Sequence, residues 1–360
     1  MMLAIGVISG TSMDGIDVAL LRTDGLTQVK PGPAATFPYP DPVAHELRAV
    51  VADPARAAGD LAELERDTTF AHVHAVEAFL ERFAIRKTEI DLVGLHGQTV
   101  LHRPAQRMTR QLCKGALAAM SLGLDVVHDF RSADVAAGGE GAPLAPLYHA
   151  AMTATLERPL MVLNWGGVGN VTYLGPRDEI LAFDTGPANA LLDDFMLRRR
   201  GVAIDENGAL AAAGRVDGAI LAALMEDPYF ALAPPKSLDR NHFHHLARRV
   251  EPLNDSDGAA TLAAFTIEAT AAALRHVPAA PQRWLVCGGG RRNAHLLQAL
   301  ERRLGVRVEP VEAIGFDGDA VEAQCFAYLA VRRAHSLPIS LPTTTRAPRP
   351  LIGGVLSLAP

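Results

Sequence analysis

The chain has 360 residues, of which 49% are apolar and 21% charged, and its formal net charge at pH 7 is −6. This length and apolar content allow a large buried core, and we expect two lobes. The mild negative charge argues against binding of nucleic acid or an anionic membrane, so a small molecule is the expected partner.

The cysteines and the first apolar run bear on location. Cys113, Cys287 and Cys325 are odd in number and widely spaced, which argues against a disulfide framework or a zinc site. The apolar run at residues 3–8 is short and lacks a basic leader, so we expect neither a signal peptide nor a membrane span there. A cytoplasmic location is expected.

The first elements in chain order are two strands around a turn, then a helix and a strand. In "ISGTSMDGIDVALL" an apolar strand enters a run of small and acidic residues, and a second apolar strand reaches Leu21. Apolar side chains at residues 70–83 recur at helical spacing, and residues 90–95 form a compact strand that runs into "HGQT". The sequence "GALAAMSLGLDVVHDFR" predicts an alanine-rich helix, a stop at Gly123 and a short strand that leads to Asp129 and Arg131.

The alternation of strands and helices predicts an α/β fold, in which ligands sit at the carboxyl ends of strands. His96, Gln98, Asp129 and Arg131 fall at such ends. "LMVLNWGGVGNVTYLG" repeats the strand, glycine turn and strand of the opening segment, which indicates two related halves. We expect a first lobe at residues 1–130 and a second at 131–360, with residues from about 326 to 360 packing back on the first lobe.

Glycine turns suggest anion binding without a P-loop. The four lysines are Lys30, Lys87, Lys114 and Lys236, and none follows a glycine, so the G-K-[ST] ending is absent. A further turn, "VCGGGRRN", lies between a predicted strand and a helix that ends at Gly305. Arg291 and Arg292 are expected to lie on a solvated helix face or to bond carbonyls near a helix end. Glycines allow close backbone approach, and free amides at such turns favour an anion.

Seven segments in order, "GTSMDGID", "GLHGQT", "DFRSADVAAGGEGAPLAP", "NWGGVGNVT", "FDTGPAN", "PPKS" and "VCGGGRRN", resemble the anhydro-N-acetylmuramic acid kinases over nearly the whole chain. That family belongs to the acetate and sugar kinase, heat-shock protein and actin superfamily. The resemblance implies a two-lobed, duplicated sugar-kinase and actin-like ATPase fold with the active site in the cleft between the lobes. It also implies ATP and Mg²⁺ as cofactors and a homodimer.

The resemblance further implies a coupled reaction on an amino sugar. Family members open the internal ether of the 1,6-anhydro sugar with water and transfer the γ-phosphoryl group of ATP to O6, in peptidoglycan recycling. Water that attacks the anomeric carbon needs a carboxylate base. The family's catalytic aspartate corresponds to Asp184 in "AFDTGPAN". The alternative is that Asp184 caps a helix that begins near Asn189.

The resemblance assigns the opening turn and the later glycine turns to ATP. The expected cofactor-binding residues are Gly10, Thr11, Ser12, Met13, Asp14, Gly15, Ile16, Asp17, Gly166, Gly167, Gly288, Gly289, Gly290 and Asn293. Asp14 and Asp17 would repel phosphate unless a cation intervenes, so we expect them to hold Mg²⁺ directly or through water. The alternatives are solvated turn formers for the aspartates and close packing for the glycines.

For the sugar, the expected contacts are His96, Gln98, Arg131, Asp134 and Glu322. Arg131 offers a positive charge to the lactyl carboxylate, and the alternative is a salt bridge to Asp129 or Asp134. A surface ion pair is the alternative for Glu322. The histidines of "NHFHH" match no standard zinc spacing, so a partly solvated loop or helix is expected there.

Departures from the family pattern leave the identity of the sugar substrate undecided. They are Cys113, Lys114, Glu140 and Ala188, and at Ala188 a backbone with positive φ would be unfavourable. Two other functions are therefore considered. One is a different sugar or carboxylate kinase of the same superfamily, and the other is a nucleotide-binding clamp with slow ATP hydrolysis and a protein partner.

Overall fold

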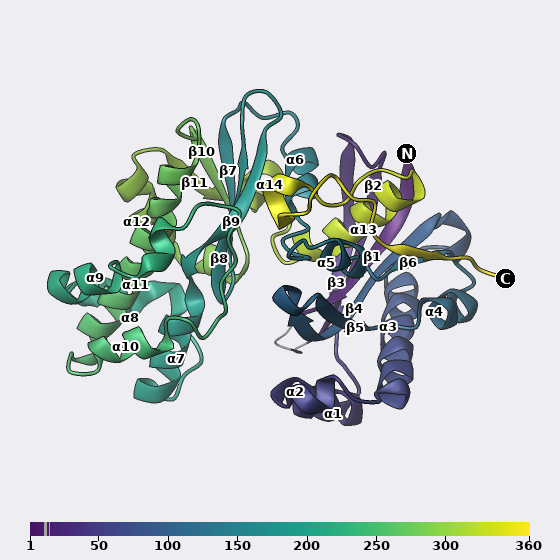
Figure 1. Cartoon of the computed structure of the whole chain (residues 1–360), viewed down its shortest axis with the longest axis horizontal. Coiled ribbons are helices and arrows are strands. Elements are labelled where there is room, and N and C mark those ends of the chain that lie inside the picture. Colours follow the sequence, from purple (N-terminus) through teal and green to yellow (C-terminus); the bar gives the residue numbers. More distant parts are fainter. Residues whose placement is uncertain (11–12, 14) are drawn as a thin grey trace. The chain divides into compact units, whose positions relative to one another are not determined.

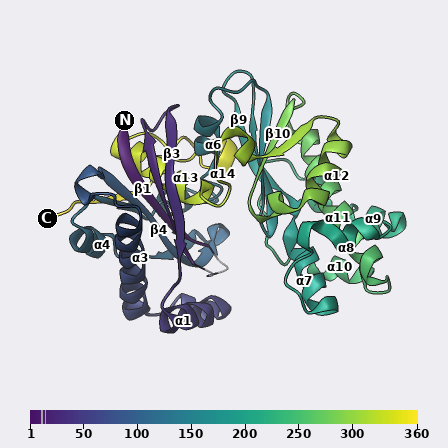
Figure 2. The same cartoon turned by 180° about the vertical axis from the view of Figure 1, so that it is seen from behind.

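The structure is a computed structural model that describes residues 1–10, 13 and 15–360. Thr11, Ser12 and Asp14, which were assigned to ATP above, lie outside the described residues. The chain divides into two compact units (Figures 1 and 2). Unit 1 comprises Met1–Thr155 and Ala320–Pro360, and unit 2 comprises Leu156–Asp319.

Unit 1 is built on a mixed sheet with the strand order β12-β6-β4-β1-β2-β3, and β5 pairs with β4. Neighbours in the run β1, β2 and β3 are antiparallel, whereas β4 is parallel to β1 and β6 is parallel to β4. The strands are β1 (Met2–Ser9), β2 (Ile16–Thr23), β3 (Val29–Phe37), β4 (Leu92–Arg103), β5 (Met108–Leu112), β6 (Val126–His128) and β12 (Val355–Ser357).

Unit 2 repeats this topology in its own sheet, with the order β11-β10-β7-β8-β9. As in unit 1, three consecutive strands, here β7, β8 and β9, are antiparallel. Two later strands extend the sheet in parallel, β10 beside β7 and β11 beside β10. The strands are β7 (Leu160–Trp165), β8 (Val168–Leu174), β9 (Ile180–Pro187), β10 (Arg283–Cys287) and β11 (Arg307–Pro310). The predicted α/β fold with two related halves is therefore confirmed.

Helices cover both sheets. In unit 1 they are α1 (Asp41–Ala52), α2 (Pro54–Ala57), α3 (Ala62–Arg82), α4 (Gly115–Leu122), α5 (Ser132–Ala136), α6 (Pro146–Met152), α13 (Val321–Ala334) and α14 (Pro342–Thr345). In unit 2 they are α7 (Asn189–Arg200), α8 (Ala209–Ala213), α9 (Gly218–Leu224), α10 (His244–Ala247), α11 (Asp255–Ala272) and α12 (Ala294–Leu304). Among the described helices, none has both the length and the apolar character of a membrane span.

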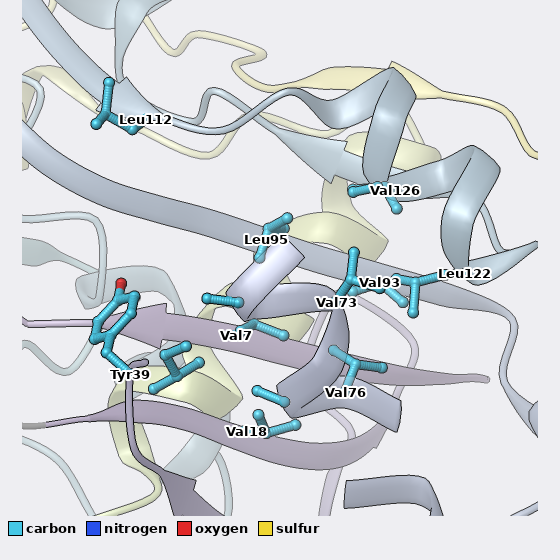
Figure 3. Close-up of a cluster of buried hydrophobic side chains, with 14 of the residues drawn as sticks. Val7, Val18, Tyr39, Val73, Val76, Val93, Leu95, Leu112, Leu122 and Val126 are labelled. Atoms are coloured by element: carbon cyan, nitrogen blue, oxygen red, sulfur yellow. The ribbon is translucent and has the colours of Figure 1, made fainter. Parts of the chain in front are cut away.

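The core of unit 1 lies between its sheet and α3. Val7 and Val18 of the sheet cluster with Val73 and Val76 of α3, and the Tyr39 ring joins the same cluster (Figure 3). Side chains alternate between the faces of a strand, so Gly6, next to Val7, faces the other way, toward the backbone of α13. Unit 1 is therefore a sheet between α3 on one face and α13 on the other.

The observed boundary between the units differs from the expected one. Unit 1 continues to Thr155 rather than ending at residue 130, because α5 packs against β5 and α6 packs against α13. Its second segment begins at Ala320, so all of α13 belongs to unit 1. The helix predicted at residues 70–83 is the second half of α3, and α4 ends at Gly123 as the sequence predicts.

Candidate functional site

Asp184 lies near the carboxyl end of β9 beside an irregularity in the sheet. Asn170 of β8 faces Asp184, but Gly169 faces Gly186, so Thr185 is an extra residue on β9. Such a bulge bends a strand and changes the direction of its side chains, and bulges occur often beside active sites. The half-buried carboxylate of Asp184 follows a buried pair, Ala182 and Phe183.

Asp184 is held, through both its backbone and its carboxylate, by η4 (Pro228–Ala231) and the segment that follows it. The Asp184 amide donates to the Lys236 carbonyl at 2.9 Å, and the Leu238 amide donates to Asp184 Oδ2 at 2.8 Å. The Tyr229 hydroxyl donates to the Asp184 carbonyl at 2.7 Å. The helix that begins at Asn189 has no side-chain cap, so Asp184 does not fill the capping role considered above.

The protonation of Asp184 is shifted toward neutral pH. Burial raises the pKa of the Asp184 carboxyl to about 7, while the hydrogen bond from Leu238 and the charge of Lys236 act in the opposite direction. A general base works best when its pKa lies near the operating pH. Asp184 therefore has the placement and the acidity of a proton acceptor.

The glycine turn between β7 and β8 is bonded to the start of α7. The amides of Ala188 and Asn189 donate to the carbonyls of Gly167 and Gly166 at 3.1 and 3.0 Å. The Asn189 side chain also donates to the Trp165 carbonyl at 2.9 Å. These bonds fix the turn, and its position between consecutive antiparallel strands of unit 2 corresponds to that of the opening turn in unit 1.

The turn after β10 packs closely on the end of β7. Gly288 has a φ of 75°, and a Cβ placed on it would lie 2.7 Å from the Trp165 carbonyl oxygen, so both its conformation and its surroundings require glycine. A Cβ on Gly290 would be equally close to Trp165, whereas Gly289 is exposed and a Cβ on it would make only an ordinary contact with the Asn189 side chain, at 3.8 Å. Asn293 caps α12 by accepting from the Leu296 amide. Close packing thus explains Gly288 and Gly290, and Gly289 is the one open to a ligand.

Arg291 supports this turn by bonding a backbone carbonyl, which is the second of the two roles expected for it, and it is not solvated. It is 7% exposed, its Nη1 donates to the Gly288 carbonyl at 3.1 Å, and it pairs with Glu312 and Asp319 at 2.7 and 2.9 Å. A buried guanidinium requires such partners. They come from segments after β11 that the local sequence around Arg291 does not indicate.

In unit 1, the described part of the opening turn joins β1 to β2. The Met13 amide donates to the Gly10 carbonyl at 3.2 Å, and Met13 has a φ of 53°. Asp17 begins the pairing of β2 with β1, and its Oδ1 accepts from the Thr36 hydroxyl at 2.6 Å. Asp17 is therefore a half-buried carboxylate that is hydrogen-bonded to the neighbouring strand β3.

A buried polar network lies at the start of this turn. The Ser9 hydroxyl donates to Gln98 Oε1 at 2.7 Å, and the Tyr39 hydroxyl donates to Ser9 Oγ at 2.6 Å. The Gln98 amide nitrogen donates to the Gly10 carbonyl at 3.3 Å. Gln98 is 0% exposed, and its amide supports the turn.

Tyr39→Phe tests this network. We expect the substitution to lower the free energy of unfolding by about 1–3 kcal/mol, because the bond to Ser9 is lost within a buried site. Urea denaturation of Tyr39→Phe, Ser9→Ala and the double variant measures the coupling between the two hydroxyls. Strict additivity of the two single effects would show that they do not act together.

His96, Arg131 and Asp134 form a second group in unit 1. His96 Nδ1 lies 2.9 Å from the Gly97 carbonyl and must carry the hydrogen, so Nε2 accepts from Arg131 Nε, also at 2.9 Å. Arg131 Nη1 donates to the Gly141 carbonyl at 2.7 Å, and Asp134 accepts from the Gly141 amide and the Thr345 hydroxyl. Arg131 thus bonds His96 and Gly141 rather than Asp129 or Asp134.

These bonds separate supporting residues from accessible ones. His96 and Asp134 are 3% and 2% exposed and have their polar atoms bonded within the unit, so the expected sugar contact is not supported for them. Arg131 is half-buried, and Glu322 is exposed in the first turn of α13. Burial lowers the pKa of Arg131, and the negative charge of Glu322 acts in the opposite direction. Arg131 and Glu322 remain the accessible pair of opposite charges in this group.

Comparison with known proteins decides the family. The family profile described as anhydro-N-acetylmuramic acid kinase matches residues 2–359. The chain belongs to the anhydro-N-acetylmuramic acid kinase family. It is 54% identical over 353 residues to the anhydro-N-acetylmuramic acid kinase of Rhodospirillum rubrum, covering 98% of this chain and 93% of that one. It is 51% identical to that of Paramagnetospirillum magneticum, covering 98% of this chain and 99% of that one.

A solved structure is also similar over most of the chain. Component A of (R)-2-hydroxyglutaryl-CoA dehydratase from Acidaminococcus fermentans aligns with a TM-score of 0.49 and 12% identity, covering 92% of this chain and 99% of that one. The family membership confirms the resemblance seen in the motifs.

Within the anhydro-N-acetylmuramic acid kinase family, the departure at Ala188 has a simple structural basis. Ala188 has a φ of −118°, so the positive φ that would disfavour alanine is not adopted. Gly186 in the same motif has a φ of 152° and provides the glycine-specific conformation. The positive φ considered for Ala188 is therefore not adopted.

The histidines of "NHFHH" are partly solvated, as expected. His242 lies 3.3 Å from Asp227, and His244 lies 3.1 Å from Asp194. His245 Nδ1 is 3.0 Å from the His242 carbonyl. Each ring thus has its own separate partner.

Lys236 and Tyr229 are the residues near Asp184 that the sequence analysis did not single out. Lys236 stands in the family-like segment "PPKS", which was the available signal. The sequence around Lys236 shows neither helical nor strand periodicity. Its contact with Asp184 could not be predicted either, because the bonded Leu238 lies 54 residues from Asp184 in the chain.

Proposed function

We propose that this protein is an anhydro-N-acetylmuramic acid kinase, which opens the 1,6-anhydro ring of its amino sugar with water and transfers the γ-phosphoryl group of ATP to O6. The products are N-acetylmuramic acid 6-phosphate and ADP. The observation that carries the proposal is the Asp184 carboxylate, held by the Leu238 amide with a pKa near 7 in a chain of this family. We further propose that it acts in peptidoglycan recycling.

Asp184 accepts a proton from the water that attacks the anomeric carbon. As the new C1–O bond forms, the bond from C1 to O6 breaks, and O6 becomes the phosphoryl acceptor. Water attack on an anomeric carbon requires one carboxylate base, as in inverting glycoside hydrolysis. The Leu238 amide keeps Oδ2 oriented, which leaves Oδ1 to receive the proton.

We assign ATP to the turn from Gly10 to Asp17 and to the turns at Gly166–Gly167 and Gly288–Gly290. Asp17 is the described carboxylate that would hold Mg²⁺, which binds through few carboxylates and keeps several waters. When bound, the ion would neutralise charge on the phosphates. We assign the sugar to Arg131 and Glu322, with His96, Gln98 and Asp134 in supporting roles.

We propose that the protein works in the cytoplasm, where ATP is available, and as a homodimer. Sedimentation equilibrium of the purified protein at several concentrations measures the assembly. A single species with the 38.2 kDa mass of one chain at all concentrations would exclude the dimer.

The decisive experiment supplies ATP, Mg²⁺ and 1,6-anhydro-N-acetylmuramic acid in ¹⁸O-labelled water. We expect a phosphorylated sugar that carries one solvent oxygen, together with one ADP per sugar. ADP formation with another sugar, and none with this one, would assign the protein to a different kinase activity. An absence of any sugar-dependent ADP would favour the nucleotide-binding clamp.

The pH dependence of the reaction follows from Asp184. Because the carboxyl must be ionised to accept a proton, we expect kcat/KM to rise with pH through about 7 and to fall about tenfold per unit well below it. Initial rates between pH 5.5 and 9 measure this fall of kcat/KM toward low pH, the acidic limb of the pH profile. A rate that is independent of pH between 5.5 and 8 would contradict the assignment of Asp184.

A further inference from the structure

Lys236 is a buried cation whose hydrogen bond goes to the backbone. It is 7% exposed, and its Nζ donates to the Tyr229 carbonyl at 3.0 Å and lies 4.5 Å from the centre of the Tyr229 ring. A buried ammonium group is unfavourable unless bonds and an opposite charge compensate. The negative charge of Asp184 acts on Lys236, so the compensating charge is the base itself.

The contacts of Lys236, Tyr229 and Leu238 with Asp184 form one closed group. Asp184 is bonded through its amide to the Lys236 carbonyl, through its carbonyl to the Tyr229 hydroxyl, and through its carboxylate to the Leu238 amide. The bond from Lys236 Nζ to the Tyr229 carbonyl joins the two ends of this segment. The side chain of Lys236 therefore ties together the elements that orient the base.

Lys236 is also the source of positive charge at Asp184 among the described residues. Opposite Asp184 on β8 stands the neutral Asn170, and Glu268 of α11, the helix packed on β9, pairs with Arg303. His276 bonds the Phe230 carbonyl, and burial together with the charge of Lys236 lowers its pKa.

We propose that Lys236 is a positioning residue for the Asp184 base. Its ammonium group joins Tyr229 to the segment at 236–238, which holds the Asp184 carboxylate in place, and its charge favours the ionised form of that carboxylate. This inference rests on the proposed function, in which Asp184 accepts the proton. Lys236 acts through Asp184 and needs no contact with either substrate.

Lys236→Met and Lys236→Arg form a matched pair for kinetics. Loss of the positive charge disfavours the ionised carboxylate, so in Lys236→Met the acidic limb of kcat/KM should move up by about one pH unit. The rate relative to the native protein then falls about tenfold more at pH 6 than at pH 9. Lys236→Arg keeps the charge, so its limb should remain near that of the native protein, and KM for ATP should change little in both variants.

A second measurement needs no turnover. Because the chain has four lysines, labelling with ¹³Cε-lysine gives a spectrum of four signals, and Lys236→Arg assigns the one from Lys236. Burial lowers the pKa of Lys236 to about 8, and Asp184 acts in the opposite direction. The coupling of two sites is reciprocal, so Asp184→Asn should lower the pKa of Lys236 further.

The two measurements separate this inference from the proposed function. Absence of activity in the native protein would overturn the function, and the lysine spectrum would still report whether Lys236 and Asp184 are coupled. An unshifted acidic limb in folded Lys236→Met, with activity unchanged or reduced equally at all pH values, would overturn the positioning role. If Lys236→Met does not fold, the lysine spectrum decides instead. An unchanged pKa of Lys236 in Asp184→Asn would then overturn the positioning role.

Discussion

Asp184→Asn should lower turnover by about 10² to 10⁴, the range for removal of a positioned acid or base, while ATP still binds. Asparagine has nearly the same shape, and its side-chain oxygen can still accept from the Leu238 amide. What it cannot do is accept a proton from water. Steady-state rates with saturating sugar, together with calorimetric titration of ATP, measure the two parts of this prediction.

The thermal stability of Asp184→Asn can be predicted as well, and its measurement shows whether the variant is folded. The pKa of Asp184 is raised in the folded protein from an ordinary value of 3.8 to about 7. Ionisation of this carboxyl therefore opposes folding, beginning above pH 4 and reaching its full effect above pH 7. We expect the Tm of the native protein to fall more between pH 5 and pH 8 than that of Asp184→Asn. Turnover near the native level in this folded variant would remove Asp184 from the mechanism.

Gly6→Ala should destabilise the protein by about 3 kcal/mol or more, because it places a methyl group inside the backbone of α13. A Cβ on Gly6 would lie far within van der Waals contact of the Ala323 carbonyl oxygen and 2.6 Å from the Ala327 nitrogen. These are backbone atoms of a buried helix, so neither can move without shifting α13. Urea denaturation measures the loss.

Gly218→Ala is the matched control for this substitution. Gly218 is the first residue of α9, and a Cβ there has no atom within 4 Å, so alanine should be neutral or stabilise by a few tenths of a kcal/mol to about 1. Equal stabilities of Gly6→Ala and Gly218→Ala would show that α13 does not lie against β1 as described.

The local patterns predicted the features that depend on neighbouring residues. The repeated strand, glycine turn and strand identified the two related halves, since each copy is contained in one short segment. Asp184 could be placed at a strand end for the same reason. The bulge at Thr185 could not be predicted, because it depends on how β8 pairs with β9.

The distinction between supporting and accessible polar residues required the folded structure. His96 and Gln98 have the residue types and the strand-end location typical of ligand contacts, yet both are bonded internally. Their partners, Arg131 for His96 and Ser9 and Tyr39 for Gln98, come from distant segments. Similarly, Arg291 is buried because Glu312 and Asp319 reach it from beyond the next strand.

The discontinuity of unit 1 has a consequence for synthesis on the ribosome. Unit 2 is one continuous stretch, Leu156–Asp319, and all of it is translated before α13. The face of β1 and β4 at Gly6 and Gly94 stays uncovered until α13 has emerged, because α13 is its cover. Unit 2 can therefore fold before unit 1 is complete. Until then the sheet of unit 1, although it is synthesised earlier, keeps an exposed apolar surface that a chaperone can bind.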